Sequence, residues 1–460
     1  MARRLAWLCI FMCGGAGPAL AHSAERGFVL LLPTGLVIAA GVAAVALSFL
    51  CLTFVKSDRL ASLLSSSCAN PLPRLATLPV SIVSAALLLL LLWAGFAGTR
   101  DPLENPLPLA IWTLWWVVLV LLHPLMGNLW SWLNPFPALL ELTGVLGSRG
   151  PRTFFRWPSH LDYAPAFLIF AGFAWFQLVY PGPEDPAVLA RAILAYGAAT
   201  LAAASLFGAE TWFAKGDPFA IFFRLLAAVA PFGDGRLRLP GAGLVAIKSL
   251  PIMGTAFVLL TLSSVSFDGF ANTFFWLALG GINPLDFPGR TAVIALNSLG
   301  LAGAFLLLML LYGLAIAAGW QLAGRPHALS DLMGRFVVSL IPISIAFHFA
   351  HYLTDLLVNG QYALASLNDP LDRGWDLLGI GELHATTSFL NTASGALAIY
   401  TAQTSAIILG HVAGVVAAHA MVAGLDLDHR RAMLIELPLA VLMVAYTGLG
   451  LWTLSTPAIG

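Results

Sequence analysis

The sequence predicts an all-α fold, a polytopic bundle of about ten transmembrane helices that follows a cleavable signal peptide. Hydrophobic residues make up 59% of the 460 residues and charged residues only 10%, whereas a soluble domain usually carries about 25% charged residues. The mean hydropathy is +0.89. Long apolar runs mean helices, because a backbone in lipid must satisfy its hydrogen bonds within its own segment.

The N-terminus has the pattern of a secretory signal. Arg3 and Arg4 precede a short apolar core at 5–13, and Ala19-Leu20-Ala21 fits the small-x-small cleavage site. We therefore expect residues 1–21 to be removed and 22–460 to form a multi-span membrane domain whose first residue is His22. The alternative is an uncleaved membrane anchor.

Ten later apolar runs are long enough to span a bilayer. They lie at about 34–55, 76–98, 107–125, 162–181, 187–208, 243–264, 291–318, 335–357, 392–421 and 433–454. Shorter runs at 130–147, 218–232 and 272–280 suggest interfacial or re-entrant helices. The first two contain Asn134-Pro135 and Asp217-Pro218, an N-cap followed by a helix-starting proline. They are expected to be short helices on the inner face.

Basic residues support this topology. With an external mature N-terminus, alternate loops hold fourteen basic residues inside and four outside, which is a strong positive-inside bias. The inner ones are Lys56, Arg59, Arg74, Arg149, Arg152, Arg156, Lys215, Arg224, Arg236, Arg238, Arg325, Arg335, Arg430 and Arg431, and the outer ones are Arg26, Arg100, Arg290 and Arg373. The prediction is a multi-pass protein of the bacterial inner membrane with both mature termini outside. Its longest outer loop is 358–391.

Several function classes do not fit the sequence. The net charge is zero and no basic stripe is present, so a nucleic-acid partner is not expected. The four cysteines form no C-x-x-C pair, which argues against a cysteine zinc site. The sequence contains no P-loop, G-x-S-x-G or H-E-x-x-H motif.

Ionisable residues at membrane depth point to a functional site. His348, His351 and Asp355 share one face of the eighth predicted span, because offsets of three and seven residues return to the same side of a helix. His411 in the ninth span is expected at a similar depth. His22 would add an amine and an imidazole outside. Imidazole and carboxylate together suit copper or zinc; a non-covalent haem between facing histidines and a packing network without metal are the alternatives.

Several segments, taken in order, resemble a family of bacterial multi-pass membrane proteins often named fenitrothion hydrolase. They are Ala21-His22, Leu32-Pro33, His123-Pro124, Trp130 to Pro135, Gly216 to Phe219, His351-Tyr352, Gly360-Gln361, Asp369-Pro370, Gly374 to Asp376 and Gly410 to Gly414 with His419. The resemblance covers most of the chain and implies an inner-membrane subunit that hydrolyses an organophosphorus triester. The chain has Pro218 where the family pattern has alanine.

Three functional hypotheses follow. The first is a His/Asp site near the outer face that binds a transition metal, with copper favoured, for metal handling or catalysis. The second is a metal-dependent phosphotriester hydrolase, in which the metal would activate water. The third is a metal-free transporter or assembly factor in which the histidines relay protons or pack helices. Besides the lipid bilayer, a second membrane or periplasmic subunit is a candidate partner.

Overall fold

The computed structural model describes residues 34–69, 76–142, 154–233, 235–286, 288–370, 373–381 and 383–456. The chain divides into two units, Met1–Leu32 and Pro33–Gly460, and every element below belongs to the second. The predicted signal peptide, its cleavage site and His22 lie outside the described residues.

Across the described ranges, nine helical segments are long and apolar enough to cross a membrane. They are α2 (Thr34–Leu52), α4 (Thr77–Ala97), α5–η1–α6 (Pro106–Pro108, Leu109–Leu119, Val120–Met126), α10 (Pro186–Phe207), α14 (Ile252–Ala271), α16 (Arg290–Leu322), α17–η4–α18 (Leu329–Phe336, Val337–Leu340, Ile341–Asn368), α19–η6 (Ala393–Val422, Ala423–Leu425) and α20 (His429–Ser455). Each corresponds to a predicted span, so a helical membrane protein is confirmed at this level.

Ten spans were predicted, and the difference lies at 162–181. This run forms α9 (Ala164–Leu178), a helix of 15 residues. At 1.5 Å per residue it is about 22 Å long, shorter than a hydrocarbon core of about 30 Å. The segment before it is folded into turns near Tyr163 instead of extending the helix.

Two other predicted boundaries were wrong. The sixth span begins at Ile252 rather than near 243, because Pro251 separates it from the short helix α13 (Ala242–Ala246). The eighth span ends at Asn368 rather than near 357, so the first part of the predicted outer loop 358–391 is helical.

Short elements connect the spans. They are α3 (Ser57–Ser65), β1 (Ser67–Ala69), α7 (Trp130–Leu133), α8 (Phe136–Leu142), α11 (Ala209–Thr211), η2 (Trp212–Gly216), α12 (Pro218–Ala227), β2 (Phe232–Gly233), β3 (Arg236–Arg238), α15 (Phe274–Leu279), η3 (Pro284–Asp286) and η5 (Ser388–Asn391). The three strands form one small antiparallel sheet in the order β1-β3-β2. This sheet holds two loops that are far apart in sequence at the same end of the bundle.

The predicted helix caps at Asn134 and Asp217 are confirmed. The Asn134 side chain accepts a hydrogen bond from the Phe136 amide at 3.0 Å, and the Asp217 side chain accepts one from the Ala220 amide at 2.7 Å. The predicted surface location of 218–232 was wrong, because most of α12 is buried in the main hydrophobic core. Its apolar side chains pack against α6 and α9, so α12 is an internal element of the bundle.

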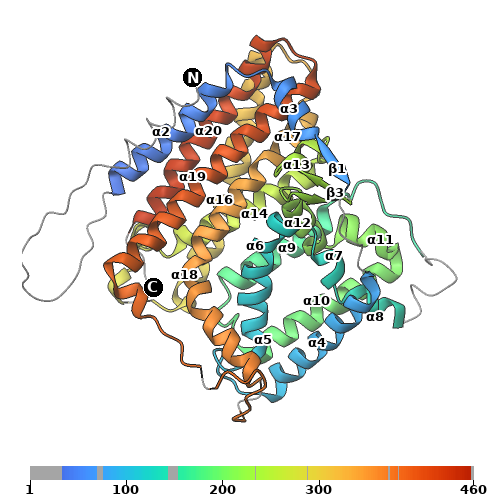
Figure 1. The fold of residues 1–460 in the computed structure, drawn as a ribbon, viewed down its shortest axis with the longest axis vertical. Coiled ribbons are helices and arrows are strands. Elements are labelled where there is room, and N and C mark those ends of the chain that lie inside the picture. Colours follow the sequence, from blue (N-terminus) through green and yellow to red (C-terminus); the bar gives the residue numbers. More distant parts are fainter. Residues whose placement is uncertain are drawn as a thin grey trace, which may run out of the picture. The chain divides into compact units, whose positions relative to one another are not determined.

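The spans form two groups that differ in how they pack. Helices α2, α19 and α20 lie side by side, and α18 packs along α19 and against η1 and α14 (Figure 1). Helices α4 and α10 pack on each other, and α4 reaches the rest of the chain through α5 at one end and through α7 and α8 at the other. The polar residues considered next lie in the first group, where α14, α18, η1 and α9 meet.

Candidate functional site

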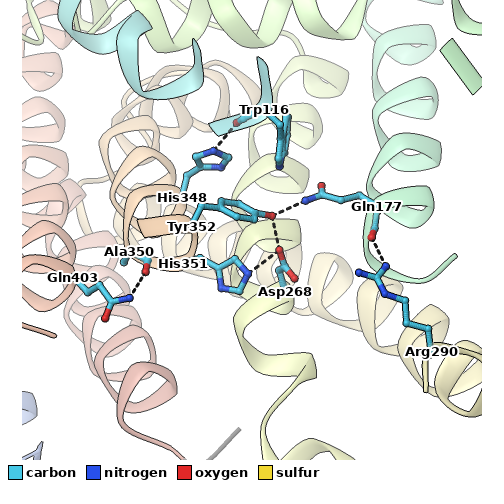
Figure 2. Close-up of polar contacts among 9 residues, drawn as sticks. All are labelled: Trp116, Gln177, Asp268, Arg290, His348, Ala350, His351, Tyr352 and Gln403. Atoms are coloured by element: carbon cyan, nitrogen blue, oxygen red, sulfur yellow. Dashed lines mark hydrogen bonds and ion pairs between the residues drawn. The ribbon is translucent and has the colours of Figure 1, made fainter. Parts of the chain in front are cut away.

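A carboxylate in the membrane-spanning region is the centre of the candidate site. Asp268 lies on the last turn of α14, and its Oδ2 atom accepts two hydrogen bonds from α18. One comes from His351 Nε2 at 3.0 Å and the other from the Tyr352 hydroxyl at 2.5 Å (Figure 2). One carboxylate oxygen therefore joins two spans through an imidazole and a phenol.

The Tyr352 hydroxyl extends this network to a third helix. Gln177, near the end of α9, donates its side-chain amide to that hydroxyl at 2.5 Å. The backbone carbonyl of Gln177 accepts a bond of 2.6 Å from Arg290 at the start of α16 (Figure 2). Arg290 also acts electrostatically on Asp268, so a cation lies at the rim of the site.

His348 connects the site to η1. Its Nε2 donates to the backbone carbonyl of Trp116 at 2.8 Å, and its ring meets the Trp116 ring edge-on at a centroid distance of 5.3 Å. Trp116 lies in η1, an eleven-residue π-helical stretch. π-Helical turns are rare and are frequent at functional sites.

The side chains of the site become less exposed from Asp355 towards His348 along α18. Asp355 is exposed, and the side chains of His351 and Asp268 are 25% and 15% exposed. Tyr352 and His348 fall to 8% and 4%. Access is therefore from the end of α18 that carries Asp355, which the predicted topology assigns to the outer face.

A small polar cavity lies on the buried side of the network. About 20 Å³ of it is open to the centre of a water molecule, which is enough for one water. Its lining includes Asp268, Tyr352, His348 and Ser344. The Ser344 hydroxyl is buried and has no protein hydrogen-bond partner among the described residues, so it is free to bind that water.

The predicted metal ligands do not converge on one point. His351 and Asp355 are neighbours that interact electrostatically, but His348 bonds to a backbone carbonyl. His411 Nδ1 donates to the Ile407 carbonyl of its own helix at 2.8 Å, and its ring packs near Phe347. In the ranges that the structure describes, no three His, Cys, Asp or Glu side chains are grouped to hold a metal ion.

The sequence analysis missed three residues of this network: Asp268, Tyr352 and Gln177. Asp268 lies four residues beyond the predicted end of the sixth span, so it was placed outside the membrane. A helical periodicity carried through to Ala271 would have included it. Tyr352 and Gln177 are uncharged, and a search for ionisable residues within spans does not detect them.

A second buried pair lies at the opposite end of the bundle. His419 on α19 contacts Glu436 on α20 at 3.0 Å, and its other ring nitrogen donates to the Val55 carbonyl at 2.9 Å. Every polar atom of this imidazole is used in joining α19, α20 and the end of α2. The bonding is that of a helix-packing contact, because both ring nitrogens are engaged in joining the helices.

The segment after α18 is ordered by side-chain caps. Asn368 accepts a bond from the Leu378 amide, and Asp376 accepts bonds from the Ile380 and Gly381 amides. A hydrogen bond from Asn368, together with these backbone bonds, holds the pKa of the Asp376 carboxyl below its ordinary value. The predicted loop thus folds over the end of the bundle through local contacts.

Comparison with known protein families, with curated proteins and with solved structures finds no match for this chain. The resemblance to the fenitrothion hydrolase family therefore stays a prediction. Function has to be argued from the geometry of the network.

Proposed function

We propose that this chain is a proton-coupled membrane transporter whose proton-binding pair is Asp268 and His351. The observation that carries the proposal is the junction at Asp268 Oδ2, where His351 and Tyr352 of α18 both donate to one carboxylate oxygen of α14. Ionisable residues inside a membrane commonly mark proton relays. Imidazole is also the side chain that changes charge near neutral pH.

Proton transfer within this pair would change how two spans are held together. With Asp268 ionised, the bonds from His351 and Tyr352 are charge-assisted, and such bonds are roughly twice as strong as neutral ones. Protonation of the carboxylate removes that advantage and loosens the contact between α14 and α18. Transport needs a two-state element biased by a local charge, and this junction supplies one.

The graded exposure supports a route from one face. A proton would pass from the exposed Asp355 to His351 and Asp268, and then through the Tyr352 hydroxyl towards the cavity beside Ser344. Ser344 and Asp355 are eleven residues apart on α18, which corresponds to about 16 Å of helix axis. The polar groups therefore cover roughly half of a hydrocarbon core of about 30 Å.

The same proposal includes ten spans with both mature termini on the outer face of the bacterial inner membrane. Strand pairing puts β1 and β3 at one end of the bundle. In the described residues between them lie the spans α4, α5–α6 and α10 and the shorter apolar helices α9 and α12; α12, with 10 residues, is too short to cross. Three crossings would separate the strands, whereas four bring them together. The ion pair of 2.6 Å between Arg100 and Asp185 supports the same count at the other end, because α5–α6 and α9 are the helices described between them apart from the short α7 and α8.

Cysteine labelling tests this topology. Cys68 in β1 is exposed, and with Cys51 replaced by serine it should react with a membrane-impermeant maleimide only after cells are permeabilised. In a Cys51→Ser/Cys68→Ser background, Glu184→Cys should react in intact cells. Labelling of both positions from the same side would show that α9 does not cross.

The metal and hydrolase hypotheses stay predictions. The contacts favour the proton site over them, because among the described residues no three His, Cys, Asp or Glu side chains are grouped to hold a metal ion. Metal analysis of the purified protein separates the hypotheses. Stoichiometric copper supports a metal-handling site, and zinc with esterase activity supports the hydrolase.

Infrared titration of the purified protein tests the proton site directly. Between about pH 5 and 8, where imidazoles titrate, the wild type should show a pH-dependent imidazole band that is absent from His351→Gln and whose pH dependence is changed in Asp268→Asn. The exposed Asp331 on α17 gives the control Asp331→Asn, which should keep the band. An identical spectrum for wild type and Asp268→Asn would overturn the proposal.

Proteoliposomes provide the transport readout. With an internal pH dye and an imposed potassium diffusion potential, wild-type protein should acidify the lumen. Asp268→Asn and His351→Gln should abolish this acidification, and Asp331→Asn should retain it. Acidification that is unchanged by both site substitutions would exclude the pair as the route.

A further inference from the structure

A large apolar cavity lies on the other side of η1 from the proton site. It has a volume of about 680 Å³, within the range of about 300–1,000 Å³ that is typical of ligand pockets. Its walls come from four membrane-spanning segments, with Leu88 on α4, Trp115 on η1, Phe173 on α9 and Ile193 on α10 among the lining residues.

The packing of α4 and α10 explains why this space stays open. A hydrophobic cluster around Leu92, Leu107 and Leu189 joins these helices to α5 at one end. A second cluster around Leu140 and Ala204 joins α10 to α8 and α11 at the other. Between the two clusters, the cavity separates α4 and α10 from η1 and α9.

The side chains that line the cavity indicate which kind of molecule could bind in it. Among the residues that the structure describes, no charged side chain lines the cavity. Of the polar groups that do, the Tyr196 hydroxyl donates to Asp217 at 2.7 Å and Trp112 Nε1 donates to the Pro183 carbonyl at 3.2 Å, whereas Trp130 Nε1 is buried without a hydrogen-bond partner among the described residues. Such walls offer dispersion contacts and very little hydrogen bonding, so they fit a hydrocarbon chain better than a polar solute.

The lipid bilayer around the protein can supply such a hydrocarbon chain. The cavity is bounded by α4, η1, α9 and α10, and three of these belong to segments long and apolar enough to cross a membrane. In a bilayer such segments are surrounded by lipid acyl chains. An unfilled apolar cavity of this size would forfeit van der Waals contacts along all of its walls. An acyl chain that enters between the helices restores those contacts without taking a polar group out of water.

A layer of aromatic rings separates this cavity from the proton site. Trp115 and Phe219 line the apolar cavity and meet at 4.7 Å between ring centroids. The neighbouring Trp116 and Phe222 line the polar cavity and meet at 5.7 Å. Phe173 completes the layer, 4.7 Å from the Trp116 ring. An occupant of the apolar cavity would thus contact a ring, Phe173, that packs against Trp116, whose carbonyl holds His348, without reaching the polar network.

We infer that this cavity is a binding site for the acyl chain of a membrane phospholipid, held between α4, α10, η1 and α9. The inference does not depend on the proton-transport proposal, because it rests on the shape and chemistry of a different set of side chains.

Gly172 provides a direct test. It lines the cavity, and a Cβ atom added there would meet no atom within 4 Å. Gly172→Phe should therefore fill the site without disturbing the backbone. Gly303 on α16 is also in open space but outside this lining, so Gly303→Phe is the matched control.

Native mass spectrometry of detergent-purified protein is the measurement. The wild type and Gly303→Phe should retain a phospholipid-sized mass, and Gly172→Phe should lose it. Ala192→Phe, which enters the same cavity from α10, should also lose it and serves as a second variant if Gly172→Phe does not fold. Equal lipid retention by all the folded variants, or a wild type that carries no phospholipid or a different hydrophobic molecule, would overturn the inference.

Discussion

The bond between Asp268 and His351 can be weighed by a double-mutant cycle with Asp268→Ala and His351→Ala. Interhelical hydrogen bonds in membrane proteins are worth about 0.6 kcal/mol on average and at most about 1.7 kcal/mol. This bond is 3.0 Å long, involves a carboxylate, and joins side chains that are 25% and 15% exposed. We therefore expect a coupling energy in the upper part of that range, about 1–1.7 kcal/mol.

Equilibrium unfolding in mixed micelles with increasing dodecyl sulfate supplies the four free energies. Asp268→Ala alone should cost more than His351→Ala alone, because it also deprives the Tyr352 hydroxyl of its acceptor. A control cycle pairs Asp268→Ala with Glu436→Ala, whose partner is His419 and which shares no contact with the site; its coupling should be near zero. If the Asp268–His351 coupling equals that of the control cycle, the junction does not hold α14 against α18.

Three further predictions concern other parts of the chain. Gly334→Ala should destabilise the protein by about 1–3 kcal/mol in the same unfolding assay, because the new Cβ would lie 1.8 Å from the Leu250 carbonyl oxygen. Gly313→Ala is the control and should be neutral, because the nearest atom to its new Cβ is 4.0 Å away. Asp376 has a lowered pKa, so its carboxylate stabilises the loop at pH values above the ordinary pKa of about 3.9, and this stabilisation is lost as the pH falls towards the pKa in the folded protein. Hydrogen-exchange protection of the loop should decrease over that pH range. Protection that does not change with pH would contradict this prediction. N-terminal sequencing of the membrane-extracted protein should begin at His22, and a start at Met1 would refute cleavage.

Hydropathy was sufficient to predict the spans because each apolar run is close to or above the length needed to cross a bilayer core. It failed where backbone chemistry intervenes. Pro251 interrupts an apolar run that continues on both sides of it, so the run from 243 was assigned to one helix. At 162–181 the composition is apolar throughout, yet the first residues fold into turns and leave the shorter α9.

The site was predicted only in part, because a sequence without its partners shows which residues share a helix face and not what that face meets. The spacing of His348, His351 and Asp355 correctly indicated a polar face on α18. The partner of that face is Asp268 on α14, two helices earlier in the chain, and not His411 on the following span. Chain neighbours pack together often, but α18 contacts several helices at once and the ionisable partner happens to lie on a different one.

The shortness of α9 has a consequence for the membrane itself. A helix of about 22 Å beside neighbours that reach about 30 Å creates a hydrophobic mismatch, which a bilayer relieves by thinning locally. Gln177 lies at the end of this helix, so the thinned region would adjoin the polar network and shorten the low-dielectric distance that a proton has to cross. The stability of the protein should therefore depend on lipid chain length, with an optimum in bilayers thinner than its longer helices alone would favour.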